Sequence, residues 1–164
     1  MCKLFPGERA RTSAAFRRMT KHVVTIGSAM ARIEGHALQT YPEECCGFLF
    51  GTESPTEFQI FRAQSVSNER AGGRTHRYLM TPDQFLKAED QAEKWDYQLM
   101  GGYHSHPDHP ASPSQFDLEH ALPGFVYLIL SVCEGYLETW RWWMLADDHQ
   151  QFDELQFTRN YKEK

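Results

Sequence analysis

The sequence predicts a single α+β domain, with a mixed central sheet flanked by helices. The chain has 164 residues, which suits one domain. Two segments, one beginning near residue 28 and one near residue 82, place apolar residues three or four positions apart, as an amphipathic helix does. Short apolar or alternating runs lie between and after them. Strands interleaved with helices in this way indicate one main sheet.

The first elements are a strand, a helix and a strand pair. The β-branched run at residues 22–26 predicts a strand. Ser28 is placed to cap the helix that follows, and Pro42 stops that helix. The apolar run at 46–51 is bounded by glycines and predicts a buried strand, with 58–66 as its partner.

The middle of the chain holds a loop and a second helix. The loop from Asn68 to Arg74 is polar and contains a Gly-Gly pair, and residues 77–80 are expected to return as a strand. Thr81 and Gln84 form a capping box with proline at the first helical position. The apolar face of this helix comprises Phe85, Ala88, Ala92, Trp95 and Leu99.

The last third of the domain consists mainly of strands. We expect strands at 99–106, 125–132, 136–145 and 152–159. The run at 125–132 is apolar without interruption, which predicts a central strand buried on both faces. A second capping box, beginning at Ser114, opens a short helix before it.

Composition excludes several classes of protein. With 41% hydrophobic and 24% charged residues, the chain is neither disordered nor a coiled coil. The net charge of −5 argues against a nucleic-acid partner, and no apolar run is long enough to cross a membrane. Cys45 and Cys46 are adjacent and fit no secreted disulfide framework. No signal-peptide core follows Met1, so we expect a cytoplasmic protein.

The N-terminal segment differs from the remainder in charge. Residues 1–21 contain six basic residues against Glu8, a net charge of +5. We expect a poorly ordered basic arm there and the folded domain at 22–164. A basic docking segment, or a true translation start at Met19, would explain the same charges.

Residues 104–117 carry the chemistry. His104 and His106 lie at i and i+2 of a predicted strand, so both imidazoles project to one face. Ser114 and Asp117 lie at i and i+3 of the short helix and share a helix face. A turn that folds the helix back would bring all four together. Two imidazoles and one carboxylate with a fourth position open are typical of a catalytic Zn²⁺ site.

These residues resemble the JAMM motif of MPN-domain metalloproteases, H-[S/T]-H-x7-S-x2-D. The stretch from His104 to Asp117 matches it at every position. The family also has a glutamate in a Pro-x-Glu-x-x-Gly segment, which matches residues 42–47 and assigns the glutamate to Glu44 rather than Glu43. The resemblance runs from about residue 22 to at least residue 132. The short length of the chain resembles that of the compact prokaryotic branch of the family. The resemblance implies a cytidine-deaminase-like fold.

The resemblance implies a role for each motif residue. His104, His106 and Asp117 would bind one Zn²⁺ per chain. Glu44 would act as general base towards the metal-activated water and then as general acid. Ser114 would stabilise the oxyanion.

The family hydrolyses peptide or isopeptide bonds after the C-terminal glycine of ubiquitin or ubiquitin-like proteins, including sulfur carriers. The implied partner is therefore a ubiquitin-like or sulfur-carrier protein with a Gly-Gly tail. Such a tail can join an open sheet edge as a strand and pass through a narrow groove. Ser105 and the loop from Asn68 to Arg74 are candidates for substrate contact. A lysine isopeptide, a peptide bond and a terminal cysteine all remain open as the bond cleaved.

Two other functions compete with a zinc peptidase. One is a catalytically silent MPN-type binding scaffold, which the intact motif argues against. The other is a zinc deaminase, whose H-x-E and P-C-x-x-C segments have no match here. His109 lies inside the seven-residue spacing of the motif, where it could touch substrate, but we expect a solvated loop histidine. His76 is expected to be structural or exposed. The oligomeric state stays open, with a homodimer as one option.

Overall fold

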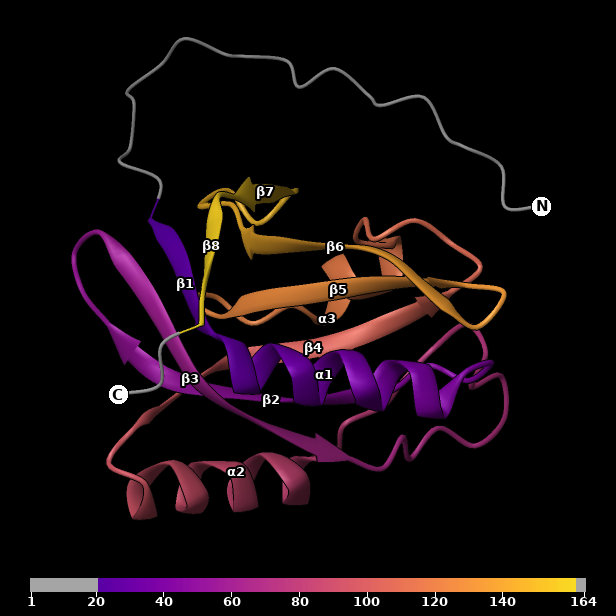
Figure 1. Ribbon diagram of the computed structural model, residues 1–164, viewed down its shortest axis with the longest axis horizontal. Coiled ribbons are helices and arrows are strands. Elements are labelled where there is room, and N and C mark those ends of the chain that lie inside the picture. Colours follow the sequence, from indigo (N-terminus) through magenta and orange to yellow (C-terminus); the bar gives the residue numbers. More distant parts are fainter. Residues whose placement is uncertain (1–20, 162–164) are drawn as a thin grey trace, which may run out of the picture.

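The computed structural model describes residues 21–161, which form one eight-stranded mixed sheet and three helices (Figure 1). This confirms the predicted fold class. In chain order the elements are β1 (His22–Ile26), α1 (Gly27–Thr40), β2 (Cys46–Glu53), β3 (Glu57–Val66), α2 (Pro82–Lys94), β4 (Gln98–Pro107), α3 (Gln115–His120), β5 (Val126–Cys133), β6 (Tyr136–Leu145), β7 (Phe152–Leu155) and β8 (Phe157–Asn160).

Strand β4 occupies the middle of the sheet. The strand order is β7-β6-β5-β4-β2-β3-β1-β8, so β2 and β5 flank β4. The pairing with β2 is antiparallel and sets Cys46 opposite His104. The pairing with β5 is parallel and sets Ile129 opposite His104. Strand β5 is buried along its whole length, as its apolar run predicts. Because β2 and β5 pair with β4 on its two sides, the backbone of β4 is held in place.

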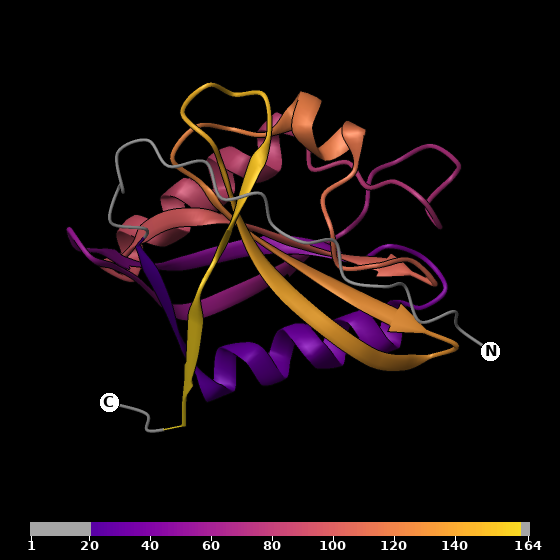
Figure 2. The same cartoon turned by 90° about the horizontal axis from the view of Figure 1, so that it is seen from above.

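Helices α1 and α2 cover opposite faces of this sheet (Figures 1 and 2). The reason lies in the alternation of side chains along β2. Leu49 points to one face and packs in the core that includes Ile33 of α1. Phe48 points to the other face and packs against Ala88 of α2. The apolar stripe predicted for α2 therefore buries against the sheet.

The predicted helix caps are partly right. Thr81 Oγ1 accepts the N–H of Gln84 at 3.3 Å and Gln84 Oε1 accepts the N–H of Thr81 at 2.8 Å, which completes the capping box of α2. Ser114 opens α3 with the second predicted box. The prediction for Ser28 is wrong. Because α1 follows β1 without a linker, its N-cap is Ile26, which makes no side-chain cap bond.

Residues 77–80 do not form the predicted strand. Their backbone groups are used within a loop. The N–H of Leu79 donates to Asn68 Oδ1 and the carbonyl of Leu79 accepts the N–H of Glu69, both at 3.1 Å. Both backbone groups of Leu79 therefore bond within the loop rather than to a sheet partner.

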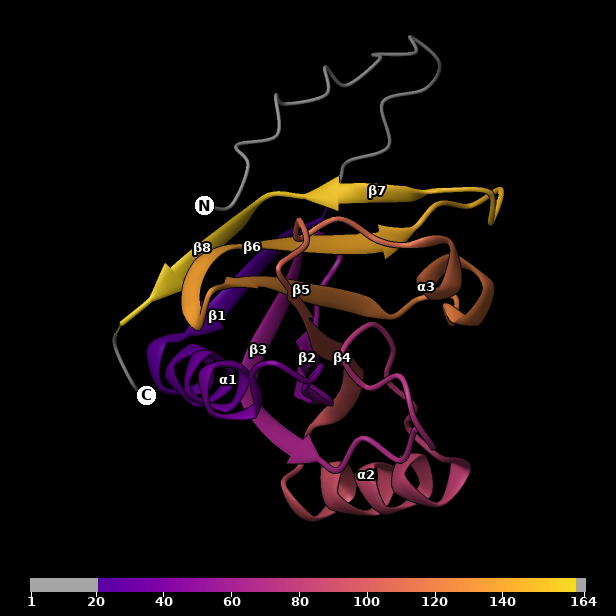
Figure 3. The same cartoon turned by 90° about the vertical axis from the view of Figure 1, so that its right-hand side faces the viewer.

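The predicted strand at 152–159 is two strands. Strand β7 pairs with β6, whereas β8 pairs in parallel with β1 at the other edge of the sheet. Gln156 alone separates them, and its carbonyl accepts the N–H of Val23. Figure 3 shows the chain passing from β7 beside β6 to β8 beside β1.

Three further predictions concern the basic N-terminal segment, membrane-spanning helices and the adjacent cysteines. The predicted basic arm, residues 1–21, lies outside the described part of the chain except for Lys21, and Met19 lies outside it too. Within 21–161, no helix is both long enough and apolar enough to span a membrane. Cys45 and Cys46 are buried free thiols, so this adjacent pair does not form a disulfide.

Candidate active site

Strand β4 brings two histidines to one buried position. His104 and His106 project from the same face of the strand, as their spacing predicts. Both are buried, and their Nε2 atoms lie 2.9 Å apart. Two imidazole nitrogens facing each other at this distance form the start of a cation site.

Helix α3 adds a carboxylate to the two imidazoles. Asp117 Oδ1 lies 3.2 Å from His104 Nε2, and Asp117 Oδ2 lies 3.7 Å from His106 Nε2. One potential ligand atom from each of the three residues lies within 4.8 Å of the others. We call these three residues the His-His-Asp cluster.

Ser114 fixes the orientation of this carboxylate. As the N-cap of α3, it donates to Asp117 Oδ2 through its backbone N–H at 2.7 Å and through its hydroxyl at 2.6 Å. Its Oγ also accepts the N–H of Asp117 at 3.2 Å. The capping box therefore has two effects: it begins helix α3, and it orients the Asp117 carboxylate towards the two histidines.

The electrostatics of the cluster favour an ionised carboxylate. Burial alone would raise the pKa of Asp117, but His104, His106 and Ser114 hold it well below its usual range. Burial lowers the pKa of His104. For His106, burial also acts downward, but the hydrogen bond and charge of Asp117 outweigh it and raise the pKa.

The tautomer of His106 follows from its second nitrogen. His106 Nδ1 lies 2.8 Å from the carbonyl oxygen of Pro110. A carbonyl only accepts, so Nδ1 carries the proton and Nε2 of the neutral ring presents its lone pair to the cluster. Histidines that bind metals are commonly held in this way by the other ring nitrogen.

Glu44 lies two residues before the start of β2 at Cys46, beside the histidine end of β4. The next residue, Cys45, is bonded to Ser105 twice: the N–H of Ser105 donates to the carbonyl of Cys45 at 3.1 Å, and the N–H of Cys45 donates to Ser105 Oγ at 2.9 Å. These bonds continue the pairing of β2 with β4. They show that the Ser105 hydroxyl is buried and engaged with backbone.

The two neighbouring glutamates have different surroundings. Glu44 is only 5% exposed, and burial raises its pKa to about 7, with smaller opposing effects of His106 and Asp117. The side chain of Glu43 is 48% exposed and lies 3.9 Å from Arg74. A buried carboxyl with a pKa near neutrality is suited to proton transfer.

A cleft of about 330 Å³ joins Glu44 to the cluster. Four parts of the chain contribute to it: the segment before β2, the loop before α2, the end of β4, and the turn between β4 and α3. Ser105 is not among its lining residues. The lining residues are Glu44, His76, His106, His109, Pro110, Ser112 and Ser114.

Three residues at the site are missing from the predicted set. His76 and His109 are exposed as expected, but they line the cleft with ring centroids 5.8 Å apart. Tyr78 stacks on His104 with centroids 4.5 Å apart and planes at 26°. They come from irregular loops, which carry no periodic signal. The place of His109 between His106 and Ser114 is the one clue the sequence offers.

An apolar pocket of about 170 Å³ adjoins the cluster. Tyr78, which stacks on His104, forms part of it, as does Phe116, the residue before Asp117. Its walls are mostly aromatic and aliphatic, and β4 contributes Gly101 and Gly102. The site therefore has one polar opening and one apolar neighbour.

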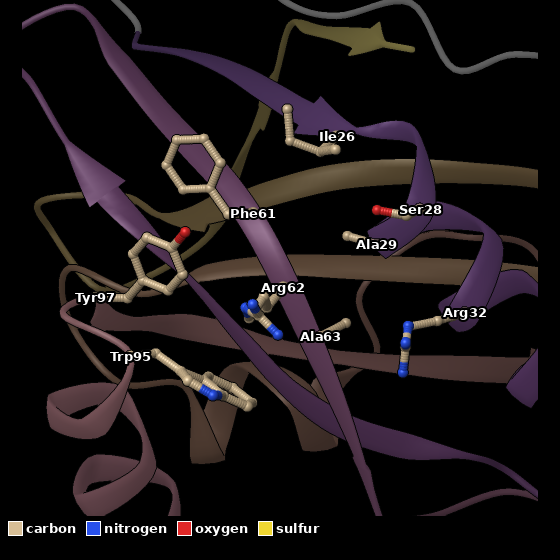
Figure 4. Close-up of a pocket in the computed structure, with 9 residues that line it drawn as sticks. All are labelled: Ile26, Ser28, Ala29, Arg32, Phe61, Arg62, Ala63, Trp95 and Tyr97. Carbon is tan, nitrogen blue, oxygen red and sulfur yellow. The ribbon is translucent and has the colours of Figure 1, made fainter. Parts of the chain in front are cut away.

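A cavity of about 440 Å³ lies at the N-terminal end of α1 (Figure 4). It contains Arg32 and Arg62 but no histidine, cysteine or carboxylate. The volume of a cavity therefore does not identify the candidate active site in this fold. Its lining residues are Ile26, Ser28, Ala29, Arg32, Phe61, Arg62, Ala63, Trp95 and Tyr97.

Known proteins resemble the chain in sequence. It is 34% identical to a desampylase of Haloferax volcanii over 102 residues, which cover 62% of this chain and 70% of the relative. It is also 34% identical to a desampylase of Pyrococcus furiosus over 76 residues, 46% of this chain and half of that relative.

Solved structures resemble the fold. The solution structure of a protein from Desulfitobacterium hafniense matches with a TM-score of 0.74 at 25% identity, covering 85% of this chain and 94% of that one. The solution structure of a protein from Salinibacter ruber matches with a TM-score of 0.65 at 38% identity, covering 83% and 90%. The family model of the prokaryotic homologues of the JAB domain matches residues 28–145, which include every residue of the predicted site. The chain therefore belongs to the prokaryotic JAB-domain family.

Proposed function

We propose that this chain is a zinc-dependent hydrolase that cleaves the bond after the C-terminal glycine of a ubiquitin-like or sulfur-carrier protein. The observation that carries the proposal is the buried His-His-Asp cluster with Glu44 in the same cleft. Similarity to two desampylases supports a substrate conjugated to a ubiquitin-like modifier. We place this activity in the cytoplasm, in keeping with the sequence prediction.

The cluster has the donor set that Zn²⁺ prefers. His104, His106 and Asp117 would hold one ion through two nitrogens and one oxygen, which leaves a fourth position for water or substrate. His104 Nδ1 is buried without a hydrogen-bond partner among the described residues. The His104 nitrogen that faces the cluster is Nε2, which lies 2.9 Å from His106 Nε2 and 3.2 Å from Asp117 Oδ1, so the case for zinc rests on the donor set. Zinc in a site of this type supplies a Lewis acid and a water of lowered pKa.

Glu44 would move the proton. At neutral pH a carboxyl with a pKa near 7 can accept a proton and return it to a leaving amine. Ser114 would stabilise the oxyanion. Ser114 lines the cleft, but its hydroxyl hydrogen is donated to Asp117, so this role requires the hydroxyl to turn towards substrate.

The apolar pocket beside Tyr78 would receive the residues before the terminal glycines. Beside the cluster itself, the tail would not add to the sheet as an edge strand. Strand β4 is paired on both sides, and the sheet edges β7 and β8 lie at the ends of the strand order. Backbone bonds to the tail would come from the loop after β3 instead. A diglycine tail suits such a passage because it carries no side chains.

The test is cleavage by zinc-loaded protein, followed by mass spectrometry. The substrates are a diglycine-tailed carrier extended by a lysine isopeptide, by a peptide or by a single cysteine. We expect a carrier ending in glycine from wild type and from the exposed-site control Glu43→Gln. Glu44→Gln should keep zinc and lose at least about 10²-fold in turnover.

Failure of zinc-loaded wild type to cleave any of the three substrates would contradict the proposal. Retained carrier binding without cleavage would favour the scaffold function. Release of ammonia from nucleosides would favour a deaminase, although the cluster contains no cysteine.

A further inference from the structure

The loop at residues 68–79 is closed by one side chain. It forms neither helix nor strand. Asn68 Oδ1 accepts the backbone N–H groups of Arg70 and Leu79, both at 3.1 Å. Asn68 Nδ2 donates to the carbonyl of Arg77, also at 3.1 Å. The two ends of the loop are therefore joined through Asn68.

The same loop holds the backbone of Glu44. Asn68 Nδ2 donates to the carbonyl of Glu44 at 3.1 Å. The N–H of Glu44 donates to the carbonyl of Arg74 at 2.7 Å. Both backbone groups of Glu44 are thus bonded to the loop, whereas the next residue, Cys45, is bonded to Ser105 of β4. The location of Glu44 depends on the loop.

The loop also reaches the cluster. Tyr78 stacks on His104, as described above. The guanidinium groups of Arg70 and Arg77 lie 5.9 and 5.3 Å from the ring centroid of Phe116, which precedes Asp117 in α3. A single segment therefore contacts Glu44, one histidine of the cluster and the helix that carries the acid.

We propose that Asn68 is a positioning residue that fixes the Glu44 carboxyl relative to the His-His-Asp cluster. This inference rests on the proposed function, because the position of the Glu44 carboxyl matters for turnover only if Glu44 transfers the proton. A general base must lie within hydrogen-bond reach of the proton it removes. A displacement of about 1 Å can lower turnover by about 10²-fold. Four hydrogen bonds from one side chain supply the required precision.

Two substitutions separate the bonds that Asn68 makes. Asn68→Asp keeps the two accepted bonds that shape the loop and loses the two donated bonds, one of them to Glu44. Asn68→Ala loses all four. Gln84→Ala is the matched control. It removes bonds to the carbonyl of Ser67 and the N–H of Thr81 at the base of the same loop, without touching Glu44.

The first readout is hydrogen exchange of the Glu44 amide, which needs neither zinc nor substrate. The Glu44 amide donates to Arg74 of the loop, and loss of the Asn68 bond to the Glu44 carbonyl leaves that amide bond alone to hold Glu44 against the loop. We therefore expect exchange at least about 10-fold faster in Asn68→Asp than in wild type, and within about 3-fold of wild type in Gln84→Ala. The second readout is kinetic. In zinc-loaded Asn68→Asp we expect kcat to fall by about 10–100-fold with KM within about 3-fold and zinc content unchanged.

The outcomes distinguish the two proposals. Unchanged exchange at Glu44 in Asn68→Asp, or equal effects in Gln84→Ala, would overturn the positioning role of Asn68. A raised KM with unchanged kcat would also overturn it, since the loop would then act only in substrate binding. Faster exchange in a protein whose zinc-loaded wild type cleaves nothing would support the anchoring of Glu44 and contradict the hydrolase function instead.

Discussion

Replacing Glu44 by glutamine should stabilise the metal-free protein at neutral and alkaline pH. Burial raises the pKa of Glu44 from 4.5 to about 7. Between these two pH values the folded state retains a proton that the unfolded state has released, so the free energy of unfolding falls as pH rises. The difference of about 2.5 pKa units, at about 1.4 kcal/mol each, amounts to about 3 kcal/mol above pH 7.

The assay is urea unfolding of chelator-treated protein at pH 4.5 and pH 8. Asp117 and both cluster histidines are present in wild type and variant, so the difference between the two proteins reports Glu44 together with its smaller interactions with His106 and Asp117. We expect Glu44→Gln to be more stable than wild type by up to about 3 kcal/mol at pH 8 and nearly equal to it at pH 4.5. The control Glu43→Gln should follow wild type. Equal pH dependence in wild type and Glu44→Gln would refute the reasoning.

Three further predictions follow from the site and its surroundings. His106→Ala and Asp117→Asn should lose the zinc that wild type binds at about one ion per chain, as measured by plasma mass spectrometry. Ser114→Ala should keep zinc, lower kcat by about 10²–10³-fold in the cleavage assay, and lower the free energy of unfolding by about 1 kcal/mol through loss of the helix cap. Gly47→Ala should lower the free energy of unfolding by about 1–3 kcal/mol or more in urea, because its Cβ would lie 2.4 Å from the backbone oxygen of Gln64.

The cluster was predictable because two local periodicities define it. The i, i+2 spacing of His104 and His106 and the i, i+3 spacing of Ser114 and Asp117 each put a pair on one face. Strand and helix geometry alone settle those faces. The turn that brings the two pairs together is a tertiary feature, and the family resemblance predicted it. Their roles in binding zinc and in catalysis stay predictions.

The errors arose where tertiary contacts replaced local preference. Residues 77–80 have the composition of a strand, but their backbone bonds go to Asn68 and Glu69 within the loop. The segment at 152–159 is extended throughout, yet its sheet partner changes at Gln156. No local sequence pattern predicts the loop at residues 77–80 or the change of sheet partner at Gln156. The same limit explains why the sequence places the loop from Asn68 to Arg74 near the site but predicts neither the bonds of the Asn68 side chain to Glu44 nor the contact of Tyr78 with His104.

The pairing of β1 with β8 bears on how the chain acquires its fold during synthesis. Val23 is paired with Phe157, which lies 134 positions later in the chain. A contact of such long sequence separation forms slowly, because a large loop must close first. On the ribosome, β1 can pair with β3 early, but its other edge must wait for β8. We therefore expect the His-His-Asp cluster, assembled from β4 and α3, to form before this edge of the sheet is complete.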